Sequence, residues 1–309
     1  MKKGIVYRST GSWYTVHSEG IFYDCRIKGK LRLKGIKSTN PVAVGDHVLF
    51  EVDRHATSPE GNITQIEERK NYIVRKSVNL SKQTHIIASN IDQVFLIITL
   101  NNPPTFPAFV DRFLVTAEAY QISAILLFNK IDSYKDFELK EVKEFQKIYQ
   151  DIGYTTFNIS ATKGIEIETV KSIMQDKVSM FSGHSGVGKS TLVNAISPGL
   201  NIKTAAISKQ HQQGMHTTTF AEMFALTKGI KIIDTPGIKG FGVVDMKPEE
   251  IGNYFPEFYK RKNKCKFHNC LHHNEPKCAI IEAVEAGKIS LSRYTSYLQM
   301  LEDDTPYRN

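Results

Sequence analysis

The chain has 309 residues, of which 41% are hydrophobic and 23% charged, with a formal net charge of +8 and a pI near 9.1. This length allows two or three domains with real cores, and the positive charge favours a polyanionic partner such as nucleic acid. The longest apolar runs, such as residues 94–100, are too short to cross a membrane. Because the first residues lead directly into a strand-like segment, we expect no signal peptide. Four cysteines, three of them clustered near the C-terminus, are not typical of a disulfide framework. We therefore expect a reduced, cytoplasmic protein.

Residues 4–68 contain short runs of β-branched and aromatic residues separated by turn residues. Five or six strands in so short a segment predict a small closed barrel, for which we expect an OB-fold in residues 1–70. Cations between Arg26 and Lys37 lie close in sequence to Trp13 and Phe22. Because phosphates contact cations and bases stack on aromatic rings, this pattern suits an RNA-binding face. A solvated hairpin beside the aromatic core of the strands explains the pattern equally well.

Beyond a basic, weakly patterned connector at residues 69–90, strands alternate with helices. We expect strands at 91–100, 124–128 and 154–159 and helices at 108–120, 136–150 and 166–175. This α/β alternation predicts a mostly parallel sheet that is covered by helices on both faces.

The tetrapeptide at 129–132 follows the strand at 124–128, at the end of the sheet where open α/β folds bind ligands. The carboxylate of Asp132 can accept two hydrogen bonds from guanine, whereas adenine would leave it unpaired. Asn129 and Lys130 would brace the loop and cover the base, and Ser160 and Ala161 would place a backbone N–H near the guanine O6. An ordinary polar loop after a strand explains either motif alone.

A phosphate-binding loop is indicated by two glycines five positions apart that are followed by Lys and Ser. It consists of Gly183, His184, Ser185, Gly186, Val187, Gly188, Lys189 and Ser190, with Thr191 next. An apolar strand precedes the loop and a helix follows it, so backbone N–H groups can surround a β-phosphate. Lys189 would neutralise the β- and γ-phosphates, and Ser190 would ligate Mg²⁺. The alternative is a chance glycine turn in an unrelated α/β protein.

The next segment, 203–216, is polar and without periodicity, and it leads to three threonines at 217–219. The middle one, Thr218, can ligate Mg²⁺ and contact the γ-phosphate, although a threonine-rich strand start is also typical here. A hairpin is expected at 220–233. After this hairpin, Asp234 is expected to make an outer-sphere contact to Mg²⁺, and the N–H of Gly237 is expected to sense the γ-phosphate.

Near the C-terminus, Cys265, Cys270, His272 and Cys278 form a C-x4-C-x-H-x5-C cluster. Three thiolates and one imidazole suit a closed, tetrahedral and therefore structural Zn²⁺ site. Spacing alone leaves His268 and His273 as rival nitrogen ligands, and free buried cysteines remain the alternative to a metal site.

Together these motifs resemble a translation-factor-type GTPase whose order has changed, because the base-reading motifs precede the phosphate loop. With a barrel in front and a Cys/His cluster behind, nearly the whole chain resembles the ribosome small-subunit-dependent GTPase A family of bacteria. The resemblance implies a circularly permuted P-loop GTPase domain at 71–240 and a helical zinc-binding module at 241–309. It favours His272 as the nitrogen ligand, one structural Zn²⁺, and Mg²⁺ bound with GTP.

The resemblance also implies a monomeric assembly factor that binds the small ribosomal subunit and its rRNA late in maturation, with GTP hydrolysis timing its release. The alternative is an RNA-binding placeholder whose nucleotide state sets its affinity and whose hydrolysis is incidental.

Small GTPases with a water-positioning Gln carry it just after the sensor Gly, where this chain has Ile238. Because Ile238 cannot hydrogen-bond water, we expect hydrolysis that is slow alone and stimulated by the small subunit. His216 is the candidate within the chain for orienting the water, beside Lys189 and Thr218 in the catalytic set. A solvent-exposed loop histidine is the alternative reading of His216.

Overall fold

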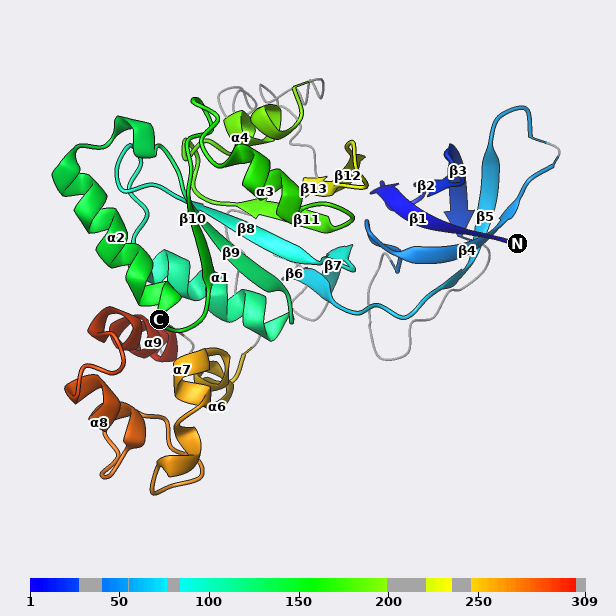
Figure 1. The fold of residues 1–309 in the computed structure, drawn as a ribbon. Helices are drawn as coiled ribbons and strands as arrows, with labels where there is room; N and C mark the ends of the chain where they lie inside the picture. The colour runs from blue at the N-terminus through cyan, green and yellow to red at the C-terminus, as the bar shows by residue number, and fades with distance from the viewer. Residues whose placement is uncertain (28–40, 55, 77–83, 199–220, 235–245, 304–309) are drawn as a thin grey trace, which may run out of the picture. The chain divides into compact units, whose positions relative to one another are not determined.

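The structure is a computed structural model that describes residues 1–27, 41–54, 56–76, 84–198, 221–234 and 246–303 (Figure 1). Two compact units divide the chain. The first contains Met1–Phe95, Ile167–Phe181 and Lys189–Lys239, and the second contains Leu96–Glu166, Ser182–Gly188 and Gly240–Asn309. Among the described residues, no helix is both long and apolar enough to span a bilayer.

The first unit begins with a closed β-barrel, drawn in blue in Figure 1. Its strands are β1 (Lys2–Ser9), β2 (Tyr14–Ser18), β3 (Ile21–Ile27), β4 (His47–Val52) and β5 (Glu60–Ile66). Their order is β1-β2-β3-β5-β4, and β4 pairs back onto β1, with β3 and β5 parallel and the other pairs antiparallel. Tyr14, Val16 and Phe50 are among the buried residues that fill it. The expected OB-fold is confirmed.

The connector at 69–90 is more regular than its sequence predicts. It contains an antiparallel pair, β6 (Tyr72–Lys76) and β7 (Thr84–Ser89), with a register shift between Ile73 and Val74. Ile73, Ile86 and Ala88 are buried, but their runs are short and the shift breaks the alternation. The weak pattern of this segment therefore did not predict its two strands.

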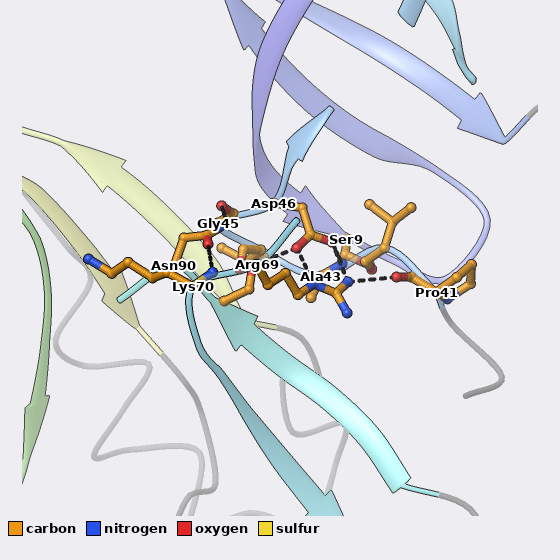
Figure 2. A network of polar contacts seen from close by, with 11 residues as sticks. Ser9, Pro41, Ala43, Gly45, Asp46, Arg69, Lys70 and Asn90 are labelled. Atoms are coloured by element: carbon orange, nitrogen blue, oxygen red, sulfur yellow. Dashed lines mark hydrogen bonds and ion pairs between the residues drawn. The ribbon is translucent and has the colours of Figure 1, made fainter. Parts of the chain in front are cut away.

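A buried polar network joins the barrel to this hairpin within the first unit (Figure 2). The carboxylate of Asp46 accepts hydrogen bonds from Arg69 Nε at 2.6 Å, Ser89 Oγ at 2.6 Å and the N–H of Ala43 at 2.8 Å. Arg69 Nη2 also donates to Asp46 and to the carbonyl of Pro41, at 2.5 and 2.7 Å. Asp46 is fully buried, and its charge is therefore matched by one arginine and two neutral donors.

Several expected α/β elements lie in the first unit. They are α3 (Ile167–Ile173), β11 (Val178–Ser182), α4 (Lys189–Ile196), β12 (Glu222–Ala225) and β13 (Lys231–Asp234). β11 pairs with β13 in parallel, and β12 pairs with β13 as the predicted antiparallel hairpin. Its turn holds Lys228 and Gly229, both with positive φ (61° and 68°), as a tight hairpin turn requires.

The strand β8 (Gln93–Ile98) passes from the first unit into the second, which continues with α1 (Pro107–Ala119), β9 (Ser123–Phe128), η1 (Ile131–Ser133), α2 (Asp136–Gln150) and β10 (Thr155–Asn158). β9 and β10 are parallel. The C-terminal part of this unit consists of α6 (Pro248–Ile251), η2 (Gly252–Tyr254), α7 (Pro256–Tyr259), η3 (Lys262–Lys264), α8 (Ala279–Glu285) and α9 (Leu291–Asp303). Phe255, Phe258 and Tyr297 form its aromatic core.

Candidate functional site

Asn129 lies at the centre of the base-reading motif, where β9 ends. Its side chain is buried and donates from Nδ2 to the carbonyl of Val187 at 2.8 Å. Its Oδ1 accepts the N–H of Ala161 at 3.1 Å. One amide therefore joins the tetrapeptide, the Ser-Ala motif and the phosphate loop. The structure brings these predicted segments together although up to 58 residues separate the bonded pairs.

Lys130 has a left-handed backbone (φ 68°), which turns the chain directly after Asn129. Its Nζ donates to the carbonyls of Gly186 at 2.8 Å and Asn102 at 2.6 Å, so its side chain links the tetrapeptide to the phosphate loop. Tyr134 is a residue that sequence reasoning missed. Its hydroxyl donates to the carbonyl of Asn129 at 3.1 Å and accepts a backbone N–H from Leu100 at 2.9 Å.

Asp132 is exposed at the rim of the same loop, and its carboxylate is near one neighbouring hydroxyl, Thr162 Oγ1, at 3.4 Å. Ser160 is buried and accepts the N–H of Lys163 at 3.1 Å, which closes a turn around Ala161. This geometry leaves the Asp132 carboxylate open to a ligand on its solvent side.

The phosphate loop runs from β11 to α4 with Ser185 and Gly186 exposed and Val187 buried. Gly188 has φ +100°, and a Cβ at this position would lie 2.5 Å from Asn129 Nδ2. Only glycine combines that backbone with so close an approach. The expected strand, loop and helix are all present at the predicted positions.

Lys189, Ser190 and Thr191 begin α4, and Asp234 ends β13 in the same unit. Burial lowers the pKa of Lys189, and the nearby carboxylate of Asp234 opposes this shift. Lys189 and Asp234 are therefore close enough to interact. Three further predicted residues, His216, Thr218 and Gly237, lie outside the described residues, as does Ile238.

The predicted metal ligands converge in the second unit. The ligand atoms of Cys265, Cys270, His272 and Cys278 all lie within 4.8 Å of one another. His272 Nδ1 is 3.3 Å from the sulfur of Cys278 and 3.6 Å from that of Cys265, and the two sulfurs are 4.0 Å apart. Ligand atoms about 2.3 Å from a tetrahedral Zn²⁺ would be about 3.8 Å apart, so the donor set fits the ion. His268 and His273 are not in this cluster.

Backbone contacts hold the metal-ligand loop in place. Tyr294 donates to the carbonyl of His272 at 2.7 Å, and Tyr297 donates to that of Leu271 at 2.5 Å. The carboxylate of Glu275 accepts the N–H groups of Leu271 and His273, and these bonds lower its pKa although its partial burial acts against them. Burial lowers the pKa of His272, which keeps the ring neutral and its lone pair available to a metal.

Two family models match the chain. The RsgA N-terminal domain matches residues 3–59, and the RsgA GTPase matches residues 66–244, which is more than half of the chain. The chain belongs to the RsgA GTPase family. This outcome confirms the family resemblance found in the sequence.

Relatives in the RsgA family match almost end to end. The small ribosomal subunit biogenesis GTPase RsgA of Christiangramia forsetii is 64% identical over 303 residues, which cover 98% of this chain and 96% of the relative. The protein of the same name from Flavobacterium psychrophilum is 64% identical over 307 residues, covering 99% and 94%.

Solved RsgA-like structures agree with the fold. YjeQ from Thermotoga maritima superposes with a TM-score of 0.82 at 34% identity, covering 99% of both chains. YloQ, described as a circularly permuted GTPase, has a TM-score of 0.76 at 30% identity and covers 100% of this chain and 97% of its own. The predicted fold class, a circularly permuted GTPase behind a β-barrel, is confirmed, and the chain is a GTPase by family.

Proposed function

We propose that this RsgA family member is a GTP-hydrolysing assembly factor that binds the small ribosomal subunit and its rRNA, with hydrolysis timing its release late in maturation. The observation that carries the proposal is a pair of hydrogen bonds at Asn129, which accepts the N–H of Ala161 and donates to the carbonyl of Val187, and so brings the base-reading and phosphate-binding loops together. The names of the relatives from C. forsetii and F. psychrophilum support the partner and the process. We also propose that the protein is a monomer and acts in the cytoplasm.

The nucleotide site is proposed to divide its roles as follows. Asp132 reads guanine, while Asn129 and Lys130 hold the loop that presents it. The backbone of residues 183–188 surrounds the β-phosphate, with Ser160, Ala161 and Thr191 at the margins of the site. Lys189 stabilises charge on the β- and γ-phosphates. Ser190 ligates Mg²⁺ directly, and Asp234 makes an outer-sphere contact to the ion. Mg²⁺ supplies charge neutralisation when it is bound with GTP.

The catalytic proposal rests on the sequence alone, because Thr218, His216 and Gly237 lie outside the described residues. Thr218 joins the Mg²⁺ ligands, Gly237 senses the γ-phosphate, and His216 orients the attacking water. Ile238 supplies no hydrogen bond at the position after Gly237. Turnover is therefore slow in the free protein and is stimulated by the small subunit.

The barrel, proposed as domain 1–70, carries an RNA-binding face. Arg26 stacks on the half-exposed ring of Trp13 at 3.8 Å, and Phe22 is 51% exposed. Stacked rings beside a cation suit unpaired bases and phosphates. The lysine and arginine residues between 28 and 37 that extend this prediction lie outside the described residues.

The proposed GTPase domain, 71–240, is followed by a zinc-binding module at 241–309, in which Cys265, Cys270, His272 through Nδ1 and Cys278 hold one structural Zn²⁺. Four protein ligands leave no open position, so the ion stabilises the module and takes no part in hydrolysis. Metal analysis of purified protein should return about one zinc per chain. A well-folded sample without zinc would overturn this part of the proposal.

GTP turnover with and without purified small subunits tests the whole proposal. We expect strong stimulation by subunits, GTP preferred over ATP, and loss of that preference in Asp132→Asn, which should instead favour xanthosine triphosphate. Equal binding of ATP and GTP by the wild type contradicts the base assignment. Subunit binding without stimulation favours the placeholder, in which nucleotide state sets affinity and hydrolysis is incidental.

A further inference from the structure

Helix α1 lies between the phosphate loop and the C-terminal helices, and all three belong to the second unit. Its residue Phe109 contacts the ring of His184 in the phosphate loop, with ring centroids 3.9 Å apart and planes tilted by 32°. Two positions later, Asp111 is fully buried and accepts a hydrogen bond from Arg293 Nη1 of α9 at 2.7 Å. Two residues within one turn of this helix, on different sides of it, therefore contact the phosphate loop and the zinc-binding module.

The contact with the module is a buried charge network. Arg293 is 1% exposed and donates from Nε and Nη2 to the two carboxylate oxygens of Glu257, at 2.8 and 3.1 Å. Asp111 also accepts the hydroxyl of Tyr149 at 2.9 Å, and the guanidinium lies 4.5 Å from the ring of Phe255. An arginine bonded on three nitrogens in a dry environment fixes its partners in position. Arg293 therefore sets the position of α1 relative to α7 and α9.

The phosphate loop is held by side chains at successive points. Lys130 binds the carbonyl of Gly186 and Asn129 binds that of Val187, while Phe109 contacts His184 on the N-terminal half of the loop. Asn129 and Lys130 belong to the base-reading motif and hold the C-terminal half of the loop. Phe109 is not part of any nucleotide motif in the sequence.

We propose that Phe109 is a positioning residue for the phosphate loop, and that the C-terminal module fixes it there through Asp111, Arg293 and Glu257. This inference rests on the proposed GTP site. The backbone N–H groups of the loop must point at the β-phosphate together, and a shift of one end of the loop misaligns them. The zinc-binding module then helps to position the phosphate loop and is a structural part of the nucleotide site.

The first test compares GDP and GMP binding in the full-length protein with Mg²⁺. Phe109→Leu should weaken GDP about three- to tenfold, the size expected for loss of an aromatic pair. GMP should be much less affected, because it lacks the β-phosphate that the loop surrounds. Phe109→Tyr should restore GDP binding. The matched control is Phe106→Leu, since Phe106 is 65% exposed at the start of the same helix.

Equal effects of Phe109→Leu and Phe106→Leu would overturn the proposal, as would equal losses for GDP and GMP, which indicate a general loss of structure. Failure of the proposed function is distinguishable, because it appears as wild-type protein that does not prefer GDP to ADP.

The second test asks whether Arg293 acts through Phe109. Arg293→Lys keeps the charge but loses the bidentate contact, and it should weaken GDP by a similar factor. In the Phe109→Leu background the same change should have little further effect on GDP binding, because the contact that it positions is already gone. Full additivity of the two losses contradicts the coupling.

Discussion

Arg69 in the first unit and Arg293 in the second are both buried beside carboxylates, but their charges are balanced differently. Arg69 pairs with Asp46 (Figure 2). Asp46 also accepts the Ser89 hydroxyl and the Ala43 N–H. Arg293 lies between two carboxylates, Asp111 and Glu257, so its network holds an excess negative charge when both are ionised. A single arginine thus pairs with one buried acid that has further hydrogen-bond donors in the first case, and with two competing acids in the second. The second network should therefore depend more strongly on its arginine.

The largest effect is expected for Arg293→Met, which leaves Asp111 and Glu257 buried without a cation. Breaking a buried ion pair costs about 3–5 kcal/mol, and here two acids lose their partner. Urea unfolding, monitored by the helix signal in circular dichroism, should show a loss of unfolding free energy at the upper end of this range. Lys288→Met, at an exposed cation in the same part of the module, is the control and should change little.

Arg69→Met should cost less, near the lower end of about 3–5 kcal/mol, because Asp46 keeps the donors from Ala43 and Ser89. Trp13 is the single tryptophan of the chain and lies in the barrel, so its fluorescence reports unfolding of this unit. Arg54→Met at an exposed position is the control. A loss as large as that of Arg293→Met would remove the distinction between the two networks.

Within the second network, Glu257→Gln should cost about 2–3 kcal/mol, because Glu257 receives two charged N–H donors. Asp111→Asn should cost less than about 1 kcal/mol, since an amide oxygen still accepts from Arg293 and Tyr149. Burial raises the pKa of Asp111, with Arg293 opposing the shift. The folded state therefore binds a proton more readily than the unfolded state.

The direction of this pKa shift predicts how the stability of the protein changes with pH. As the pH falls from neutrality through the folded-state pKa of Asp111, wild-type protein should gain stability relative to Asp111→Asn. The measurement is the difference in unfolding free energy between the two proteins across that range. An opposite slope would mean that Arg293 outweighs burial at this carboxylate.

Within the first network, Ser89→Ala is expected to have a smaller effect than Arg69→Met. It removes one of the neutral donors to Asp46 and should cost about 1 kcal/mol by Trp13 fluorescence. Ser58→Ala, on the exposed turn before β5, is the control. An effect above about 3 kcal/mol, which is the range for a broken ion pair, would show that Ser89 and not Arg69 dominates the balance at Asp46.

Local pattern predicted most of the elements and the motif positions, because periodicity, turn residues and glycine spacing act over a few residues. It predicted α2 to the residue and indicated that Asn129 braces its loop, but it did not predict the hydrogen bond from Asn129 to Val187. It missed Arg69 and Arg293, whose partners Asp46 and Asp111 are 23 and 182 residues away. Asp111 reads as an ordinary polar position of an amphipathic helix, and no local signal marks it as buried.

The Phe109–His184 contact was missed for the same reason, since an aromatic residue on a helix is typical of a core. The order of the motifs was readable because each carries its own spacing, while their mutual contacts depend on the fold.

The hydrogen bonds of Asn129 also bear on how the chain is made. Synthesis proceeds from the N-terminus, so the base-reading loop emerges before residue 187 exists. Until then the Nδ2 donor of Asn129 has no Val187 carbonyl to bind, and a buried amide without its partner is unfavourable. We therefore expect the base-reading loop at 129–132 to lack its native conformation while β10 and α3 are being synthesised. If the loop recognises guanine as proposed, recognition should begin only when the phosphate loop has left the exit tunnel, so the permuted order makes the two halves of the site mature in one step.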